Sequence, residues 1–482
     1  MNERSNSESV DSMADYLSHY AVASPLRITE NSRERLKLIL IDSFAVALAA
    51  LRHSPAIVAR RYASSSVSET ARCAIWGTSK RTRPEVAALT NGVLLRCHDF
   101  NDLYLGSKSW GHPSDIIPAV LAVAEQRQAS GREFLDALAV GYDVTLALFD
   151  TLPAASSGWD YSNLTLLGAV CAIARLSNFS QETAREALSI ASISHFASDE
   201  IESGDLNARG DLTMWKRFNA GDAMRQAVYA CELAQAGVEG AVRPFEGANG
   251  LLRKLGVPES AGADMRARLG REVTLSNLDK VVLKRWPVGS RAQIAIQAAF
   301  EIRNQIRNPA HIDKVHVRTT EAVYEHLVRS RPHAWNPISR ETADHSLVYI
   351  IGAALLDGVI NADSFSRVRV VDPERQAFLQ KIVVAPDLNA CAPTHAFAST
   401  IEVTMSDGRV LLSSDIAQRS SSSLQTLVED KFWECCRQAG LQAKAQTLLE
   451  TLDRLDSIDQ VQDITSQLIT DSGALLDEAL SD

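Results

Sequence analysis

Helical spacing of apolar residues dominates the first half of the chain. From about residue 14 to residue 270, apolar side chains recur at intervals of three and four positions. One such stripe runs from Leu36 to Leu51 and follows Ser32, which we expect to cap the helix. Further segments of this kind are rich in alanine and apolar on most faces, which is typical of helices buried in a large helical domain; they are 131–149, 167–176, 184–196 and 219–235.

The pattern changes after Gly270. Strand-like apolar residues run over 273–283, and Val315 and Val317 alternate with polar neighbours. The apolar positions of 401–412 flank a central Ser-Asp-Gly-Arg, the sequence signature of a β-hairpin. Helical spacing returns in 291–305 and 343–357 within this region, and again over 424–470.

These patterns predict a mainly α protein with a second, α+β domain. We expect the large helical domain to cover residues 14–270 and to be completed by residues 414–482. Residues 271–413 would form the smaller α+β domain, inserted between the two helical parts. A chain of 482 residues is long enough for two or three domains.

Composition narrows the classes of function. With 46% hydrophobic and 22% charged residues, the chain has the profile of a globular protein with a large core. Its net charge of −10 provides no overall basic field for nucleic acid or an anionic membrane surface. Residues 1–18 are polar and acidic rather than a basic segment followed by an apolar one. We therefore expect a cytoplasmic protein that binds neither nucleic acid nor membrane.

No pattern in the chain indicates a metal site or a cofactor. The seven cysteines are scattered and none forms a C-x-x-C pair, so a disulfide framework, a zinc knuckle and an iron–sulfur cluster are not predicted. His311 and His316 have no third ligand nearby. We expect neither a metal nor a cofactor.

The densest polar cluster lies between residues 97 and 115. It contains Asp99 and, thirteen positions later, His112, across a stretch with Gly106 that reads as a loop. Imidazole titrates near neutral pH and a carboxylate can orient it, so this pair suits proton transfer. The alternative is a solvated loop in which Ser114 or Asp115 caps the helix that begins near Ile116.

Two further clusters place adjacent cations before a helix. Lys216 and Arg217 stand between aromatic residues at the start of an alanine-rich helix, and Lys284 precedes a turn that contains Arg291. Such cations at a helix N-terminus could bind a carboxylate. Taken alone, each cluster could equally be an ion-paired surface turn.

Together these clusters resemble the signature of the MmgE/PrpD family, whose members include 2-methylcitrate dehydratase and cis-aconitate decarboxylase. The resemblance rests on motifs that follow one another in the family's order and extends from about residue 14 to residue 435; the motifs are Arg96–Asp102, Trp110–Asp115, Lys216–Asp222, Leu283–Pro287, and Asp344–Ser346 leading to Leu356–Gly358.

The resemblance implies a large helical domain and a smaller α+β lid, with the active site between them in a homodimer. Carried over by motif, Asp99 and His112 match the family's active-site aspartate and histidine, and Lys216 and Lys284 match its two lysines. His112 would be the acid–base group, with Asp99 as its orienting partner or a second proton carrier, and the lysines would bind carboxylates. Further candidates for substrate binding are Asn101, Asp102, Ser114, Arg217, Arg291 and His345.

The chain also departs from the family pattern. Leu103 stands where many members have threonine, which removes a hydroxyl. A histidine that members often carry near the position of Asp160 or Tyr161 is absent, and a second is absent near Arg291 and Gln293. Fewer proton carriers and an added cation indicate an altered substrate or reaction step.

The leading hypothesis is therefore a metal-independent lyase that hydrates or dehydrates a citrate-like di- or tricarboxylate. Abstraction of a proton next to a carboxylate needs a base, departure of hydroxide needs an acid, and cations must stabilise the developing charge. Decarboxylation or epimerisation of a related acid is the alternative reaction. A non-catalytic paralogue that binds a carboxylate is the alternative from another class.

Overall fold

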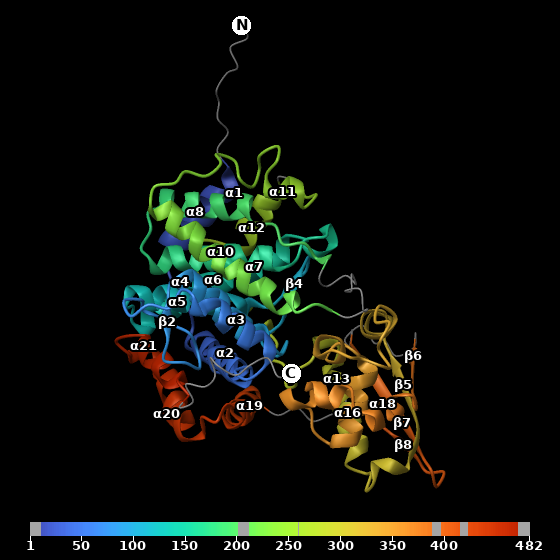
Figure 1. The fold of residues 1–482 in the computed structure, drawn as a ribbon. Coiled ribbons are helices and arrows are strands. Elements are labelled where there is room, and N and C mark those ends of the chain that lie inside the picture. The colour runs from blue at the N-terminus through green and yellow to red at the C-terminus, as the bar shows by residue number, and fades with distance from the viewer. Residues whose placement is uncertain (1–10, 201–211, 259, 388–396, 415–422, 471–482) are drawn as a thin grey trace.

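The computed structural model describes residues 11–200, 212–258, 260–387, 397–414 and 423–470. Figure 1 shows a tall helical part and, beside its lower end, a smaller lobe that contains the main sheet. The protein is mainly α with a smaller α+β part, which confirms the predicted fold class. Within these ranges, no helix is both long and apolar enough to cross a membrane.

The helical part is built from helices that pack on one another around α6, α7 and α10. Its elements before residue 270 are α1 (Ser12–Ala23), α2 (Glu30–Ala49), α3 (Ser54–Ser64), α4 (Pro84–Arg96), α5 (Ile117–Arg127), α6 (Gly131–Thr151), α7 (Ser162–Leu176), α8 (Gln181–Ser194), α10 (Trp215–Gln235), α11 (Leu251–Lys254) and α12 (Ala261–Leu269). Two short antiparallel pairs accompany them, β1 (Cys73–Ala74) with β2 (Arg81–Thr82) and β3 (Tyr104–Leu105) with β4 (Trp110–Gly111).

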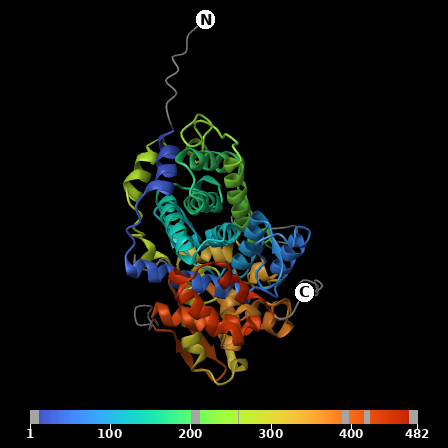
Figure 2. The ribbon, with the colours of Figure 1, turned by 90° about the vertical axis from the view of Figure 1, so that its left-hand side faces the viewer.

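The three α-helices within residues 423–470 lie against this helical part. They are α19 (Leu424–Ala439), α20 (Gln442–Asp453) and α21 (Gln462–Thr465). They pack beside α2 and are the red helices at the lower end of the helical part in Figures 1 and 2. Phe432, Leu448 and Leu455 belong to the same hydrophobic core as the N-terminal helices. The sequence predicts that residues 414–482 complete the helical domain. Residues 415–422 and 471–482 of that range lie outside the described residues.

The smaller lobe has its own core. A four-stranded sheet in the order β6-β5-β7-β8 packs against helices that include α13 and α16. The elements are α13 (Gln293–Arg303), β5 (Ile312–Thr319), α14 (Glu321–Tyr324), α15 (Arg340–Ala343), α16 (Leu347–Asp357), α17 (Arg367–Val370), α18 (Pro373–Leu379), β6 (Ile382–Pro386), β7 (Ser399–Met405) and β8 (Val410–Leu412).

The pairing of these strands follows from their side-chain pattern. In β7 the residues Ser399, Ile401, Val403 and Met405 are buried while those between them are partly exposed, as expected for a strand with one face on a core. β7 pairs with β8 through Thr404 and Val410, which confirms the predicted hairpin. β5 lies parallel to β6 and antiparallel to β7.

Two expected local features differ from the structure. The strand-like residues of 273–283 form only single bridges, from Val273 to Leu26 and from Val282 to Leu103. Except for the exposed Val282, their apolar side chains pack in the core of the helical part. Ser32 does not cap α2, because the cap is Thr29, whose hydroxyl accepts a hydrogen bond from the Ser32 amide at 3.1 Å.

Candidate active site

A small polar pocket lies where the helical part meets the smaller lobe. Side chains from both parts line it, so its walls are brought together only by the tertiary fold. Six site residues predicted from the sequence are among them; they are Asp99, His112, Lys216, Lys284, Arg291 and His345. The other lining residues are Arg96, Leu103, Trp110, Gly289, Ser290, His326 and Leu327.

Close contacts at two glycines, Gly92 and Gly111, let the elements around the pocket approach one another. α4 leads into the Asp99 loop and α10 carries Lys216, and they cross at Gly92 and Gly221, where a Cβ on Gly92 would lie 2.8 Å from the Gly221 Cα. Next to His112, a Cβ on Gly111 would lie 2.4 Å from the Phe149 ring. Since real Cβ contacts are longer than this, a larger residue at either position would displace a wall of the pocket.

Asp99 is the central carboxylate of the pocket. Its backbone has a φ of 47°, in the left-handed region that non-glycine residues seldom adopt. One carboxylate oxygen accepts from Arg96 at 2.8 Å, and the other lies 2.9 Å from the Lys284 ammonium. Burial alone would raise the pKa of Asp99, but Lys284 and Arg96 outweigh it and hold that pKa well below its usual range. Asp99 is therefore ionised.

His112 is held in one tautomer. Its Nδ1 hydrogen-bonds to the backbone carbonyl of Asp102, which can only accept, so Nδ1 carries the proton. The other nitrogen, Nε2, lies 3.5 Å from an oxygen of Asp99. Burial, followed by the charges of Arg96 and Lys284, holds the pKa of His112 well below its usual range. The imidazole is thus neutral, with an unprotonated nitrogen on the side of Asp99.

Lys284 comes from the segment that joins the two parts of the molecule. Its ammonium is almost fully buried and donates to the backbone carbonyl of Asp99 at 2.6 Å as well as to the carboxylate. Burial, helped by Arg96 and Lys216 and opposed by Asp99, lowers the pKa of Lys284 to about 8. A lysine with such a pKa can donate a proton near neutral pH and recover it.

His345 reaches the pocket from the smaller lobe. Its Nδ1 donates to Asp344 at 2.5 Å, and its Nε2 lies 3.8 Å from Asp99. The second oxygen of Asp344 accepts from Arg217 of α10 at 2.7 Å. Arg217 and Asp344 are both fully buried, so this ion pair joins the helical part to the lobe and sets the direction of the His345 ring.

Asn101, Asp102 and Ser114 lie behind the pocket wall, where their polar groups bond to protein. Asn101 accepts from Arg96 at 2.7 Å and donates to Ser114 at 2.9 Å. Asp102 accepts from both the amide and the hydroxyl of Ser114. Burial raises the pKa of Asp102 to about 6. The loop is therefore a packed, hydrogen-bonded support for the pocket and not a solvated cap.

The positions that depart from the family pattern also lie at this wall. Tyr161 packs edge-on against His112, with ring centroids 5.3 Å apart, and its hydroxyl donates to the buried Asp115 at 2.9 Å. Gln293 bonds to backbone groups of the turn after Lys284, through Arg285 N and Trp286 O. These two residues thus support groups of the site.

Arg291 and Lys216 add positive charge to the pocket. The Arg291 guanidinium lies 5.9 Å from the centre of the Trp110 ring, and Lys216 is 4% exposed. Among the described residues that line the pocket there are four cations, Arg96, Lys216, Lys284 and Arg291, and one carboxylate. This excess of positive charge suits an anion that carries several carboxylates.

Arg96 and His326 were not predicted from the sequence as site residues. Arg96 stands inside the first motif, three positions before Asp99, and its place in that motif could have indicated it. His326 lies on a π-helical turn, Glu325–Arg329, of the smaller lobe. Turns of this kind are frequent at functional sites, but nothing near His326 in the sequence indicates one.

Comparison with known proteins covers both parts of the molecule. The family model described as the MmgE/PrpD N-terminal domain matches residues 11–262, and that described as the MmgE/PrpD C-terminal domain matches residues 286–457. The chain belongs to the MmgE/PrpD family.

Members of the MmgE/PrpD family that resemble this chain include both dehydratases and a decarboxylase. The 2-methylcitrate dehydratase of Cupriavidus necator is 25% identical over 423 residues, which cover 83% of this chain and 82% of the relative. The mitochondrial 2-methylcitrate dehydratase of Yarrowia lipolytica is 23% identical over 434 residues, covering 85% and 79%. Human cis-aconitate decarboxylase is 25% identical over 402 residues, covering 79% and 78%.

Proposed function

We propose that this protein is a lyase that removes water from, or adds water to, a citrate-like di- or tricarboxylate by acid–base catalysis without a metal. The observation that carries the proposal is the neutral His112, whose unprotonated nitrogen lies beside Asp99 in a pocket with four cations. The dehydratases among the relatives support the same class of reaction.

His112 is the proposed base. In the dehydration direction, Nε2 takes the proton from the carbon next to a carboxylate, and the electron pair forms the new carbon–carbon double bond as the carbon–oxygen bond breaks. The carboxylate beside that carbon gains negative charge during this step, and cations that are already in place stabilise such charge most effectively. Lys216, Arg96 and Arg291 are proposed to bind the substrate carboxylates.

Lys284 is the proposed acid. It would give a proton to the departing hydroxide, which leaves as water, so that His112 ends protonated and Lys284 neutral. Asp99 lies between the two groups, 3.5 Å from His112 Nε2 and 2.9 Å from Lys284 Nζ. It is therefore placed to orient both and to pass the proton back. Its low pKa favours this role over that of a second acid.

The proposal of metal independence has a physical basis in the same charges. The described residues contain no group of three or more His, Cys, Asp or Glu side chains that could hold a metal ion. A divalent cation in the pocket would also be repelled by Lys284, Arg96 and Lys216, and the one carboxylate there is already paired.

The deciding experiment is incubation of the protein with citrate, 2-methylcitrate, cis-aconitate and related acids, followed by NMR. We expect one or more of these acids to gain or lose water, with the same rate after chelation of metals. A rate that falls on chelation and is restored by one ion contradicts metal independence. Loss of carbon dioxide instead of water assigns a decarboxylase, and binding without turnover assigns a carboxylate-binding paralogue.

A further inference from the structure

Lys431 is a buried lysine on α19, far from the active-site motifs in the sequence. It is 6% exposed, and its ammonium contacts three oxygens. It donates to the backbone carbonyls of Phe100 at 2.8 Å and of Lys284 at 3.1 Å, and it lies 2.8 Å from the Asp42 carboxylate of α2. An ammonium has three N–H donors, so these three oxygens can use all of them.

The two carbonyls belong to the two chain segments that form the centre of the site. Phe100 directly follows Asp99, and Lys284 is the residue that contacts the Asp99 carboxylate. The same two segments also meet at Leu103 and Val282, which exchange two backbone hydrogen bonds of 2.8 Å. The backbone bridge and Lys431 thus both tie together the two segments that carry Asp99 and Lys284.

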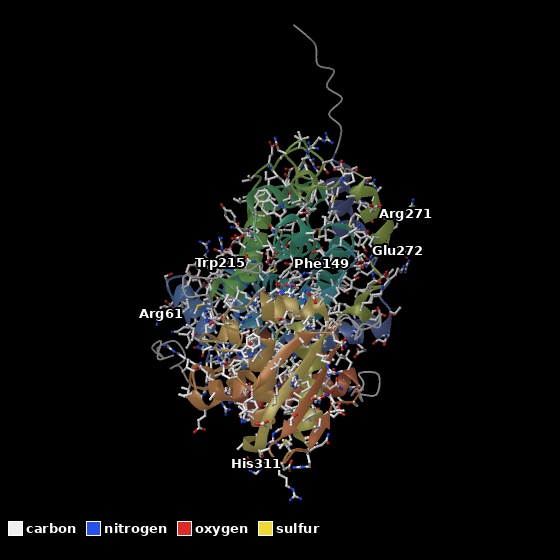
Figure 3. All side chains as sticks on the ribbon, turned by 90° about the vertical axis from the view of Figure 1, so that its right-hand side faces the viewer. Arg61, Phe149, Trp215, Arg271, Glu272 and His311 are labelled. Atoms are coloured by element: carbon white, nitrogen blue, oxygen red, sulfur yellow. The ribbon has the colours of Figure 1, made fainter. Side chains whose placement is uncertain are left out.

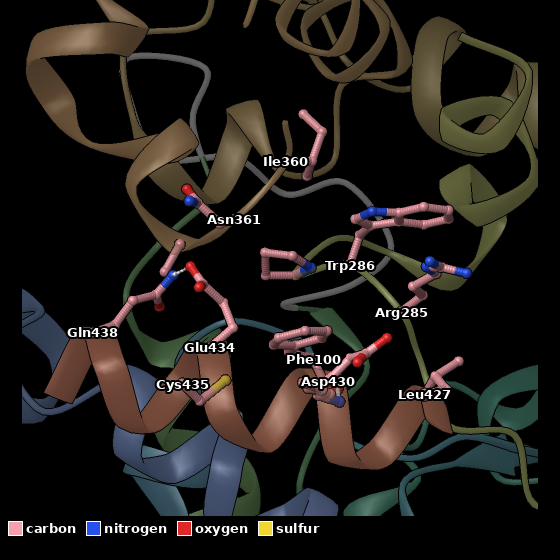
Figure 4. Close-up of a pocket in the computed structure, with 13 residues that line it drawn as sticks. Phe100, Arg285, Trp286, Ile360, Asn361, Leu427, Asp430, Glu434, Cys435 and Gln438 are labelled. Carbon is pink, nitrogen blue, oxygen red and sulfur yellow. Dashed lines mark hydrogen bonds between the residues drawn. The ribbon is translucent and has the colours of Figure 1, made fainter. Parts of the chain in front are cut away.

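The surroundings of Lys431 explain why a side chain is needed to hold these two segments together. A hollow lined by Phe100 lies between α19 and residues 360–362 of the smaller lobe. Figure 4 shows α19 as its floor, with Phe100 and Asp430 at the centre and Trp286 at one side. Side-chain packing around Phe100 is therefore incomplete at this hollow. The Lys431 ammonium, which lies 3.7 Å from the centre of the Phe100 ring, adds a contact there.

We propose that Lys431 is a positioning residue for the reaction, which holds the Asp99 loop and the Lys284 segment at the separation that pairs Asp99 with Lys284. This inference rests on the proposed function for its effect on turnover. It assigns a role to the last helical segment, which otherwise only packs on the helical part. Loss of the three contacts would let the Lys284 backbone shift away from Asp99 while the pocket cations remain.

The test must separate positioning from folding, because Lys431→Met alone leaves the fully buried Asp42 without its cation, which is strongly destabilising. The double variant Asp42→Asn/Lys431→Met removes the charge pair as a unit and is the main variant. Lys37→Met is the matched control, since Lys37 is 8% exposed and also bonds to a carboxylate and a carbonyl, those of Asp456 and Asp453.

Two readouts are measured on the full-length protein. The first is the pH dependence of Lys284 labelling by a small amine-reactive reagent, measured by peptide mass spectrometry. It reports the pKa of Lys284 without need of a substrate. We expect the midpoint to move in the double variant and to stay near 8 in wild type and Lys37→Met. The second is turnover of the acid found by NMR, where we expect kcat to fall roughly 10²-fold with little change in KM.

Lys431→Arg is the conservative variant, because it keeps a positive charge and several N–H donors. We expect its kcat and its labelling midpoint to lie between those of the wild type and those of the double variant. A folded double variant with wild-type labelling and kcat overturns the proposal, as does an equal change in Lys37→Met. Should the double variant not fold, the same two readouts on Asp42→Asn/Lys431→Gln decide, and wild-type values in that variant overturn the proposal. Absence of turnover in wild type would count against the proposed function alone, since the labelling still tests Lys431.

Discussion

Protonation of His112 and Lys284 is the residue-scale event on which the proposed reaction depends. The base must be neutral and the acid protonated. With the pKa of His112 well below its usual range and that of Lys284 lowered to about 8, both conditions hold around neutral pH. We expect kcat to be level below pH 7 and to fall as the pH rises through about 8, where Lys284 loses its proton. A pH profile of kcat checks this.

Lys284→Arg is the control for that profile, because arginine does not titrate in this range. The remaining activity of the variant should show no fall near pH 8. If the fall persists there, another group in the site is responsible for it.

Removal of the base should have a large effect on turnover. We expect His112→Ala to lower kcat by about 10²–10⁴-fold, the usual range for loss of a general acid or base. His311→Ala is a suitable control, because His311 is exposed at the end of the lobe that points away from the helical part, as Figure 3 shows. Steady-state kinetics on the two folded variants measure the difference, and near wild-type turnover in His112→Ala would mean that the base is another group.

Leu103 should limit the reaction with 2-methylcitrate. It is 3% exposed and lines the pocket in place of the family's threonine. A hydroxyl that hydrogen-bonds to the substrate typically contributes about 0.5–1.5 kcal/mol. Leu103→Thr should therefore raise kcat/KM for 2-methylcitrate by roughly two- to tenfold. A wild-type kcat/KM for 2-methylcitrate above about 10⁴ M⁻¹s⁻¹, which is typical of an enzyme on its own substrate, would show that leucine at position 103 does not impair the reaction.

Residues of the site differ in how far the sequence alone can reveal them. Asp99, His112 and Lys284 stand in local motifs, so pattern and resemblance are enough to select them. Lys431 and His326 belong to segments with no such motif, and only the tertiary fold brings them to the pocket or its support. Sequence reasoning cannot separate a buried lysine of this kind from one on a solvated helix face.

At the scale of elements, the long helical stripes and the hairpin were predicted correctly from local pattern. The helix after Gly131 is α6, and the hairpin near residue 407 is β7–β8. The strand expected over 273–283 was wrong, since the chain there finds single partners, Leu26 and Leu103, on different elements instead of one neighbouring strand. Those partners are more than 150 residues away in sequence, and apolar alternation carries no information about them.

The contact between α10 and the segment before α16 leads to a stability prediction. Arg217 and Asp344 form a fully buried ion pair across the two parts of the molecule. Asp344→Asn leaves the guanidinium buried without its partner, so we expect a loss of about 3–5 kcal/mol in unfolding free energy. Urea unfolding measures it.

Two variants test whether that loss comes from the buried charge. The double variant Arg217→Met/Asp344→Asn should recover much of the stability, because no uncompensated charge remains. Asp407→Asn, which removes a fully exposed pair with Arg409, should leave the unfolding curve unchanged. Equal losses in the single and double variants would assign the effect to packing.

At the scale of the whole molecule, the pocket depends on both the helical part and the smaller lobe, each of which has its own core. The lobe supplies Arg291, His326 and His345, and the helical part supplies Asp99, His112 and Lys216. Lys284 lies in the segment between the cores. A change in the angle between the helical part and the smaller lobe would therefore separate the base and most of the cations from the groups on the lobe. The Arg217–Asp344 pair opposes such a change.

The prediction of a homodimer belongs to this scale. It comes from the family resemblance, and large apolar side chains exposed along α10 and just after α8 support it. Phe196, Trp215 and Tyr229 are each more than 40% exposed. The end of α8 lies beside α10, where His195 is 4.0 Å from Asp222, and Figure 3 shows Trp215 at the edge of the molecule. Apolar surface of this kind commonly marks an interface between protein chains.

We expect light scattering at micromolar concentration to give the mass of two chains. A charge in the apolar surface would have to be desolvated on association, so Phe196→Asp/Tyr229→Asp should shift the protein to one chain. Val368→Asp introduces the same charge at an 80% exposed position of the other lobe and should leave the dimer intact. A wild-type monomer contradicts the prediction, and a dimer that survives the double substitution places the interface elsewhere. Because Lys216 directly follows Trp215, a dimer through this surface would also cover the end of α10 that carries a pocket cation.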